Sequence, residues 1–151
     1  MKATLTLLAI LALFFATPAA HAVEKPHDHA LVGGPKGGRL LEHTEPRAEF
    51  FVEKDKTVTI TFYDSQLNPV PVAEQTVVVI AELDGVKTTL EFEKKDDVLV
   101  SKGKLPEGHA PKLVVQFKQT ADAKQQNFRF VIEDHVCSVC KRAEYACICG
   151  H

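Results

Sequence analysis

The sequence contains no tryptophan and only one methionine, Met1. Met1 lies in a segment that we expect to be cleaved, so the mature protein should have no thioether ligand. This excludes one soft-ligand route to binding Cu(I). The absence of tryptophan removes another contact that soft metals use, and it says nothing about the fold.

The sequence also lacks a strong excess of charge of either sign. It has 18 Lys and Arg against 20 Asp and Glu, which gives a formal net charge of −2. Proteins that bind nucleic acid or anionic membranes usually present a basic patch or a positive net charge. We therefore expect no nucleic acid among the partners of this protein.

Long hydrophobic runs are scarce, and the one that stands out lies at the N-terminus, in residues 5–15. It is too short to span a membrane as a helix. Lys2 precedes it, and Ala20-His21-Ala22 follows with the small-x-small pattern of a cleavage site. We predict a signal peptide over residues 1–22, a secreted or periplasmic location, and no membrane insertion once the signal is removed.

Recognisable catalytic motifs are missing as well. The chain has no nucleophile elbow, no phosphate-binding loop, and no acid/base pair beside a cofactor motif. Its carboxylates are spread over turns and solvent-facing positions, as in the charged turn that contains Asp96 and Asp97. We predict that the protein is not an enzyme.

Short segments that alternate apolar and polar residues fill residues 48–133. In one of them Val58, Ile60 and Phe62 share a face, as in a half-buried strand. Asp84-Gly85 joins two such runs, which is typical of a two-residue hairpin turn. The pattern predicts an all-β domain, a small antiparallel β-sandwich of about seven strands. The expected strands are residues 48–53, 56–63, 76–83, 86–92, 98–101, 112–119 and 125–133.

Residues 23–47 contain several prolines and glycines, and we predict a flexible, irregular arm there. His27 and His29 lie on this arm with a carboxylate between them. Both rings can turn toward one ion, and imidazole binds zinc, copper and nickel. The alternative is a solvated polar arm without a ligand role.

All four cysteines lie in a C-terminal tail, residues 134–151, as a Cys-x-x-Cys pair followed by a Cys-x-Cys pair. Each pair can offer two thiolates to one ion, and four thiolates form the tetrahedron of a structural zinc site. Two flanking histidines widen the choice of ligands. The spacing predicts a metal-binding tail, with zinc as the first choice and copper(I) as the second. The expected ligands are Cys137, Cys140, Cys147, Cys149, His135 and His151.

Two other interpretations of the tail remain open. An exported protein with an even number of cysteines is normally disulfide-bonded, and the pairs Cys137–Cys149 and Cys140–Cys147 are geometrically plausible. A redox-active dithiol is the third interpretation, although it usually occurs in a βαβ context that this chain lacks. The strand series ends near Glu133. We therefore expect the tail to be an appendage, without which the sandwich still folds.

A family resemblance is carried by residues 34–42, GPKGGRLLE, and by residues 48–52, AEFFV. These segments are similar to small periplasmic β-sandwich proteins associated with heavy-metal efflux, and to the N-terminal region of metal-efflux pump adaptor subunits. That family often has a histidine where this chain has Lys36. His27 and His29 resemble the His-rich arm of the family, whereas the cysteine tail is not part of the resemblance.

The resemblance implies a stand-alone accessory protein that handles metal, with a component of an efflux pump as a partner. The residues and the resemblance together favour an exported transition-metal-binding protein that acts as a carrier, buffer or accessory factor. The alternative is a disulfide-stapled β-sandwich that serves as an interaction module without metal.

Overall fold

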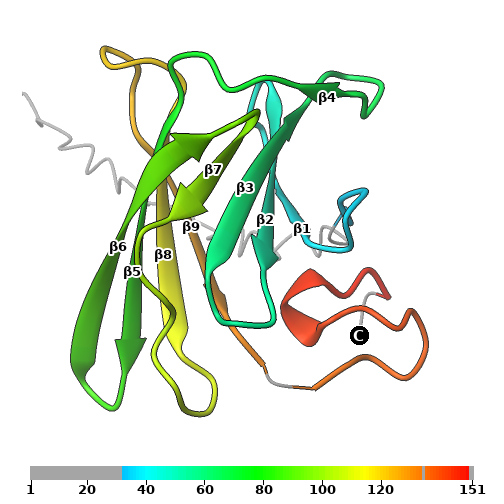
Figure 1. Ribbon diagram of the computed structural model, residues 1–151. Helices are drawn as coiled ribbons and strands as arrows, with labels where there is room; N and C mark the ends of the chain where they lie inside the picture. The colour runs from blue at the N-terminus through cyan, green and yellow to red at the C-terminus, as the bar shows by residue number, and fades with distance from the viewer. Residues whose placement is uncertain (1–31, 134, 150–151) are drawn as a thin grey trace, which may run out of the picture.

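The computed structural model describes residues 32–133 and 135–149 (Figure 1). The predicted signal peptide, His27, His29 and His151 lie outside the described residues. The described residues contain no α-helix and one short 3-10 helix, η1 (Glu144–Ala146). None of their helices has the length and apolar character needed to cross a membrane.

The described chain is all-β and antiparallel, which confirms the predicted fold class. It has nine strands rather than about seven, because the alternating pattern of the sequence did not predict two short strands. They are β1, which lies within the predicted arm, and β4, which begins with a proline. The strands are β1 (Arg39–Leu41), β2 (Arg47–Val52), β3 (Val58–Tyr63), β4 (Pro69–Val70), β5 (Thr76–Leu83), β6 (Val86–Lys95), β7 (Val98–Ser101), β8 (Lys112–Lys118) and β9 (Gln126–Val131).

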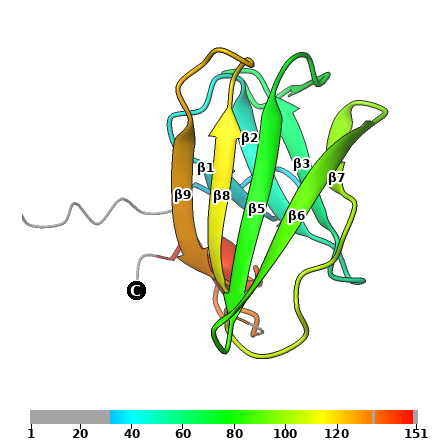
Figure 2. The same ribbon diagram turned by 90° about the vertical axis from the view of Figure 1, so that its left-hand side faces the viewer.

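The strands follow the order β1-β2-β3-β7-β6-β5-β8-β9, with β4 paired to β3. Strand β6 turns the corner between two layers: Val86 to Glu91 pair with β5, and Phe92 to Lys95 pair with β7. Figures 1 and 2 show the layer of β5, β8 and β9 facing the layer of β1, β2 and β3. The sheet is nearly closed into a barrel, and its two end strands, β1 and β9, flank the remaining seam.

Apolar side chains from both layers fill the barrel. Strand β3 is buried along its whole length, because β2 and β7 flank it and the opposite layer covers its inner face. Phe62 of β3 packs near Phe117 of β8, with ring centroids 6.3 Å apart. The largest apolar side chains that are fully buried are Phe50, Phe62, Phe117, Ile60, Leu90, Leu113, Val58, Val79 and Val115.

The C-terminal tail packs into this core, which the expectation of an appendage did not include; that the sandwich folds without the tail stays a prediction. Tyr145 and Ala146 of η1 are 7% and 1% exposed and belong to the same hydrophobic cluster as the barrel interior. The Tyr145 ring lies edge-on to Phe50 at 6.0 Å and stacks on Phe130 at 6.4 Å. Aromatic residues in such contacts stabilise the fold through the ring–ring interaction in addition to the apolar area that they bury. The tail therefore covers one side of the barrel, beside β1 and β2 (Figure 1).

Candidate metal centre

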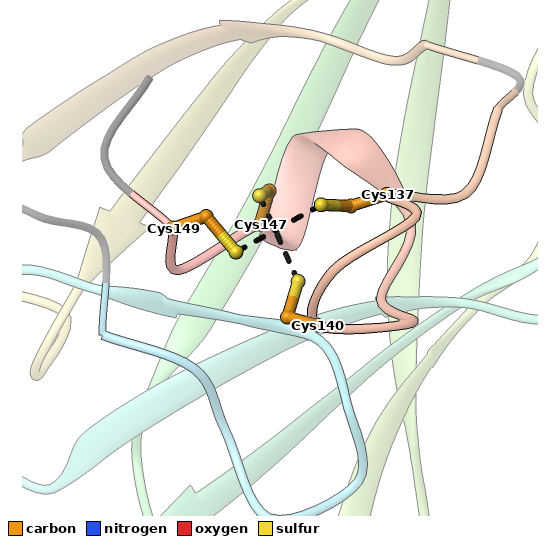
Figure 3. A group of neighbouring side chains, drawn as sticks. All are labelled: Cys137, Cys140, Cys147 and Cys149. Atoms are coloured by element: carbon orange, nitrogen blue, oxygen red, sulfur yellow. Dashed lines mark hydrogen bonds between the residues drawn. The ribbon is translucent and has the colours of Figure 1, made fainter.

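The four cysteines of the tail meet at one point. Their Sγ atoms all lie within 4.8 Å of one another, and no other group of this kind is found in residues 32–133 and 135–149. The Sγ atoms of Cys137 and Cys149 are 3.8 Å apart, and those of Cys140 and Cys147 are 3.7 Å apart. The four side chains point inward from a loop and from the segment around η1 (Figure 3).

These separations match a tetrahedral metal site. With metal–sulfur bonds of about 2.3 Å, each sulfur–sulfur edge of a regular tetrahedron is about 3.8 Å long. A disulfide requires sulfur atoms about 2.05 Å apart. All four cysteines are free thiols, so the structure does not contain the two disulfides of the alternative interpretation. The sulfur atoms of the two pairs that the disulfide interpretation named are 3.8 and 3.7 Å apart, which is a non-bonded separation.

A tight turn presents the first pair of sulfurs. The Lys141 N–H donates to the Cys137 carbonyl at 3.0 Å, and the Cys137 N–H donates to the Arg142 carbonyl at 2.8 Å. Lys141 adopts a φ of 59°, in the left-handed region. This conformation reverses the chain directly after Cys140, so both cysteines of the Cys-x-x-Cys pair face the same side. The turn that follows, η1, then delivers Cys147 and Cys149 to the cluster.

The protein environment sets different proton affinities for the four thiols. Backbone N–H groups of Ile148 and Arg142 donate to the Cys140 sulfur, and this lowers the pKa of that thiol. The N–H of Cys149 lowers the pKa of the Cys147 thiol. Burial and contact with the neighbouring thiols together have the larger effect, so the pKa of Cys147 is raised. Burial, followed by contact with the other thiols, raises the pKa of Cys149 to about 12. Cys140 is therefore the first of these three to ionise.

This ordering predicts that metal binding releases protons. Cys147 and Cys149 both have a pKa above the ordinary value of 9.0, so both are protonated near neutral pH. Because the metal ligand is the thiolate, at least these two protons must leave when an ion binds. We expect the logarithm of zinc affinity to rise with pH between about pH 6 and 8, with a slope of at least about two. Calorimetry in buffers of different ionisation enthalpy measures the released protons, and clearly fewer than two protons per zinc would contradict this.

The predicted histidine ligands are placed differently from the cysteines. The His135 ring nitrogens lie 3.9 Å from a Glu133 oxygen and 3.7 Å from a Glu144 oxygen, and its side chain is 64% exposed. The structure thus places His135 between two carboxylates and does not bring it into the sulfur cluster. His27, His29 and His151 lie outside the described residues.

Sequence reasoning missed a buried carboxylate beside the tail. Glu49 of β2 is fully buried and accepts hydrogen bonds from the N–H groups of Lys36 and Gly38 and from the Tyr63 hydroxyl, at 3.2, 2.7 and 2.7 Å. Burial and the bond to Glu49 raise the pKa of Tyr63. Three donors satisfy the carboxylate, as a buried charge requires. The glycine-rich loop, residues 33–38, therefore folds over Glu49.

Arg142 was missed too, although it lies two residues after the first cysteine pair. Its guanidinium Nη1 donates to the carbonyls of Gly34 and Gly38, at 3.1 and 3.4 Å. A basic residue next to Cys-x-x-Cys was the only available signal, and it does not identify the acceptor. The contact ties the tail to a loop that lies more than a hundred residues away in the sequence.

Comparisons with models of protein families, with curated proteins and with solved structures found no match. The classification of the site therefore rests on its geometry. The described chain is a small antiparallel β protein with a cluster of four cysteine thiols at metal-binding distance. Such a sulfur set is suited to a tetrahedral ion of the zinc type.

Proposed function

We propose that this protein is an exported transition-metal-binding protein that holds one ion at Cys137, Cys140, Cys147 and Cys149. The observation that carries the proposal is the convergence of four sulfur atoms within 4.8 Å of one another, with two separations, 3.8 and 3.7 Å, that equal the edge of a zinc–thiolate tetrahedron. Zinc is the preferred ion, because it takes four thiolates in this geometry, and copper(I) is the alternative that the soft ligands allow. Its role is to bind and transfer metal, without catalysis.

The exposure of the cysteines supports a carrier or buffer. Cys137 and Cys147 are buried, whereas Cys140 and Cys149 are only half-buried. An acceptor can therefore approach the two half-buried sulfurs while the buried pair still holds the ion. Ligand exchange of this stepwise kind needs an accessible edge on the site, and the tail provides one.

Export and a role in metal efflux complete the proposal. The signal-like N-terminus supports a periplasmic location. The similarity of residues 34–42 and 48–52 to proteins of heavy-metal efflux supports an accessory role beside a pump component. Fractionation of cells that express the full chain tests the location: we expect processed protein in the periplasm, and an unprocessed cytoplasmic protein would contradict it.

Metal content tests the central proposal. We expect the reduced protein to bind one zinc per chain and, in the same titration, to lose the reactivity of all four thiols toward a thiol reagent. The metal identity comes from elemental analysis of protein isolated from the producing cells. Protein isolated without metal and with a mass four hydrogens lower than the reduced chain would instead establish two disulfides, and the proposal would fail.

A further inference from the structure

Side chains from β1 and from the tail bridge the seam between β1 and β9. In the described residues the two strands stand at opposite ends of the strand order and do not pair with each other. Arg39 of β1 lies over the Phe130 ring of β9 at 4.7 Å, and Tyr145 stacks on the same ring. The Tyr145 hydroxyl also accepts the outward-facing N–H of Val52 at 3.0 Å. The tail therefore contacts both sides of the seam.

The glycine-rich loop forms the second attachment of the tail. A Cβ atom on Gly33 would lie 2.6 Å from the Arg142 guanidinium, and one on Gly34 would overlap the Glu49 carboxylate at 2.0 Å. Glycine at these positions lets the backbone pass between two charged side chains. Glu49 holds the loop from the barrel side through N–H groups, and Arg142 holds it from the tail side through carbonyls.

The tail has little regular structure to hold its own shape. In the part of the tail that the structure describes, the backbone outside the three-residue η1 is joined by an isolated bridge between Val136 and Ala143 and by a few turn hydrogen bonds. Thiols are weak hydrogen-bonding groups, so four clustered thiols hold one another weakly. Hydrogen bonds and thiol contacts within the tail are too weak to offset the conformational entropy that the tail loses when it takes one fixed shape. A metal ion joined to all four sulfurs supplies the missing cross-links.

We propose that metal occupancy of the cysteine cluster controls the docking of the tail on the barrel, and so opens or closes the β1–β9 seam. This inference rests on the proposed metal-binding function. With metal bound, the cluster holds Arg142 over the glycine-rich loop and Tyr145 against Phe130, and the seam is closed. Without metal, the tail loosens, and the Val52 N–H and the aromatic cluster become accessible. An acceptor protein can thus distinguish loaded from empty protein by its surface.

Amide exchange in the full-length protein tests the docking directly. We expect saturating zinc to slow hydrogen exchange of the Val52 amide at least about tenfold relative to chelator-treated, reduced protein. The near-ultraviolet circular dichroism of Tyr145 should strengthen in parallel. The chain has only two tyrosines and no tryptophan, so a Tyr145→Phe variant gives the background signal of Tyr63.

A pair of variants with the same change in charge isolates the Arg142 contact. Arg142→Gln removes the charged donor to the Gly34 and Gly38 carbonyls but keeps all four sulfurs. If metal binding favours docking, docking favours metal binding by the same free energy. We therefore expect the Arg142→Gln variant to bind zinc about tenfold more weakly and to protect the Val52 amide less from exchange. Lys124→Gln makes the same change in charge at an exposed side chain outside the tail, and it should behave as the unmodified protein.

Two results would overturn the inference, and they are distinguishable. If one zinc binds but Val52 exchanges equally fast with and without it, the tail is docked independently of metal while the proposed function stands. If no zinc binds, the proposed function fails and the inference fails with it. The comparison of the unmodified protein with and without zinc decides the matter even if the Arg142→Gln variant does not fold.

Discussion

Replacing Cys147 by serine is expected to lower the zinc affinity of this protein about 100-fold or more. Structural zinc sites contribute roughly 10–16 kcal/mol, so each of four thiolates accounts for about 3 kcal/mol. A serine hydroxyl stays protonated near neutral pH and is a poor ligand for zinc. Cys147 is a buried member of the cluster, 3.7 Å from Cys140, and no other described sulfur can replace it.

Competition with a chromophoric chelator measures this loss. The matched control is Ser138→Ala, which changes an exposed residue inside the Cys-x-x-Cys turn and leaves every sulfur in place. We expect the control to bind zinc as the unmodified protein does. A Cys147→Ser variant that kept its affinity within threefold would show that the four sulfurs do not act as one site.

Replacing Tyr145 by alanine is expected to destabilise the zinc-loaded barrel by about 3–4 kcal/mol, close to the range for large aromatic residues truncated in a core. The change removes the ring contacts with Phe50 and Phe130. It also leaves the Val52 N–H without the hydroxyl that accepts it. An apolar gap and an unpaired donor at the same place both weaken the fold.

Denaturant unfolding at saturating zinc measures this effect, with the slope checked for two-state behaviour. Tyr145→Phe is the control, because it keeps the ring and removes only the hydroxyl. It should cost about 1 kcal/mol, the usual net contribution of one hydrogen bond. If Tyr145→Ala lost less than 1 kcal/mol, the tail would be the appendage that its position after the last strand suggests.

The fold class could be predicted because alternation is a local property. Val58, Ile60 and Phe62 repeat with the period of a strand, and all three are fully buried in β3. The pair Asp84-Gly85 joins β5 to β6, and both residues have positive φ, as the hairpin signal requires. Strands β1 and β4 were missed because three and two residues are too few to show a period.

The alternating pattern could not predict that the outer face of a strand, the face opposite to the barrel interior, is also buried. Alternation places Glu49 on the face opposite to Ala48 and Phe50, where a carboxylate is expected to meet solvent. The glycine-rich loop covers that face, and Glu49 is fully buried. The glycines of this loop predict an irregular arm, because they break regular structure. They do not indicate which side chains the loop packs against.

The sequence by itself determined the ligand type and the half-site spacing of the metal centre. Cysteines two and three positions apart must lie close in space, since the chain between them is too short to separate them. Only the tertiary structure decided that both pairs converge at one point, that His135 lies outside the sulfur cluster, and that the tail docks on the barrel beside β1 and β2. Those outcomes depend on Arg142 meeting the glycine-rich loop and on Tyr145 meeting Phe50 and Phe130. Residue spacing does not encode contacts between side chains so far apart in the chain.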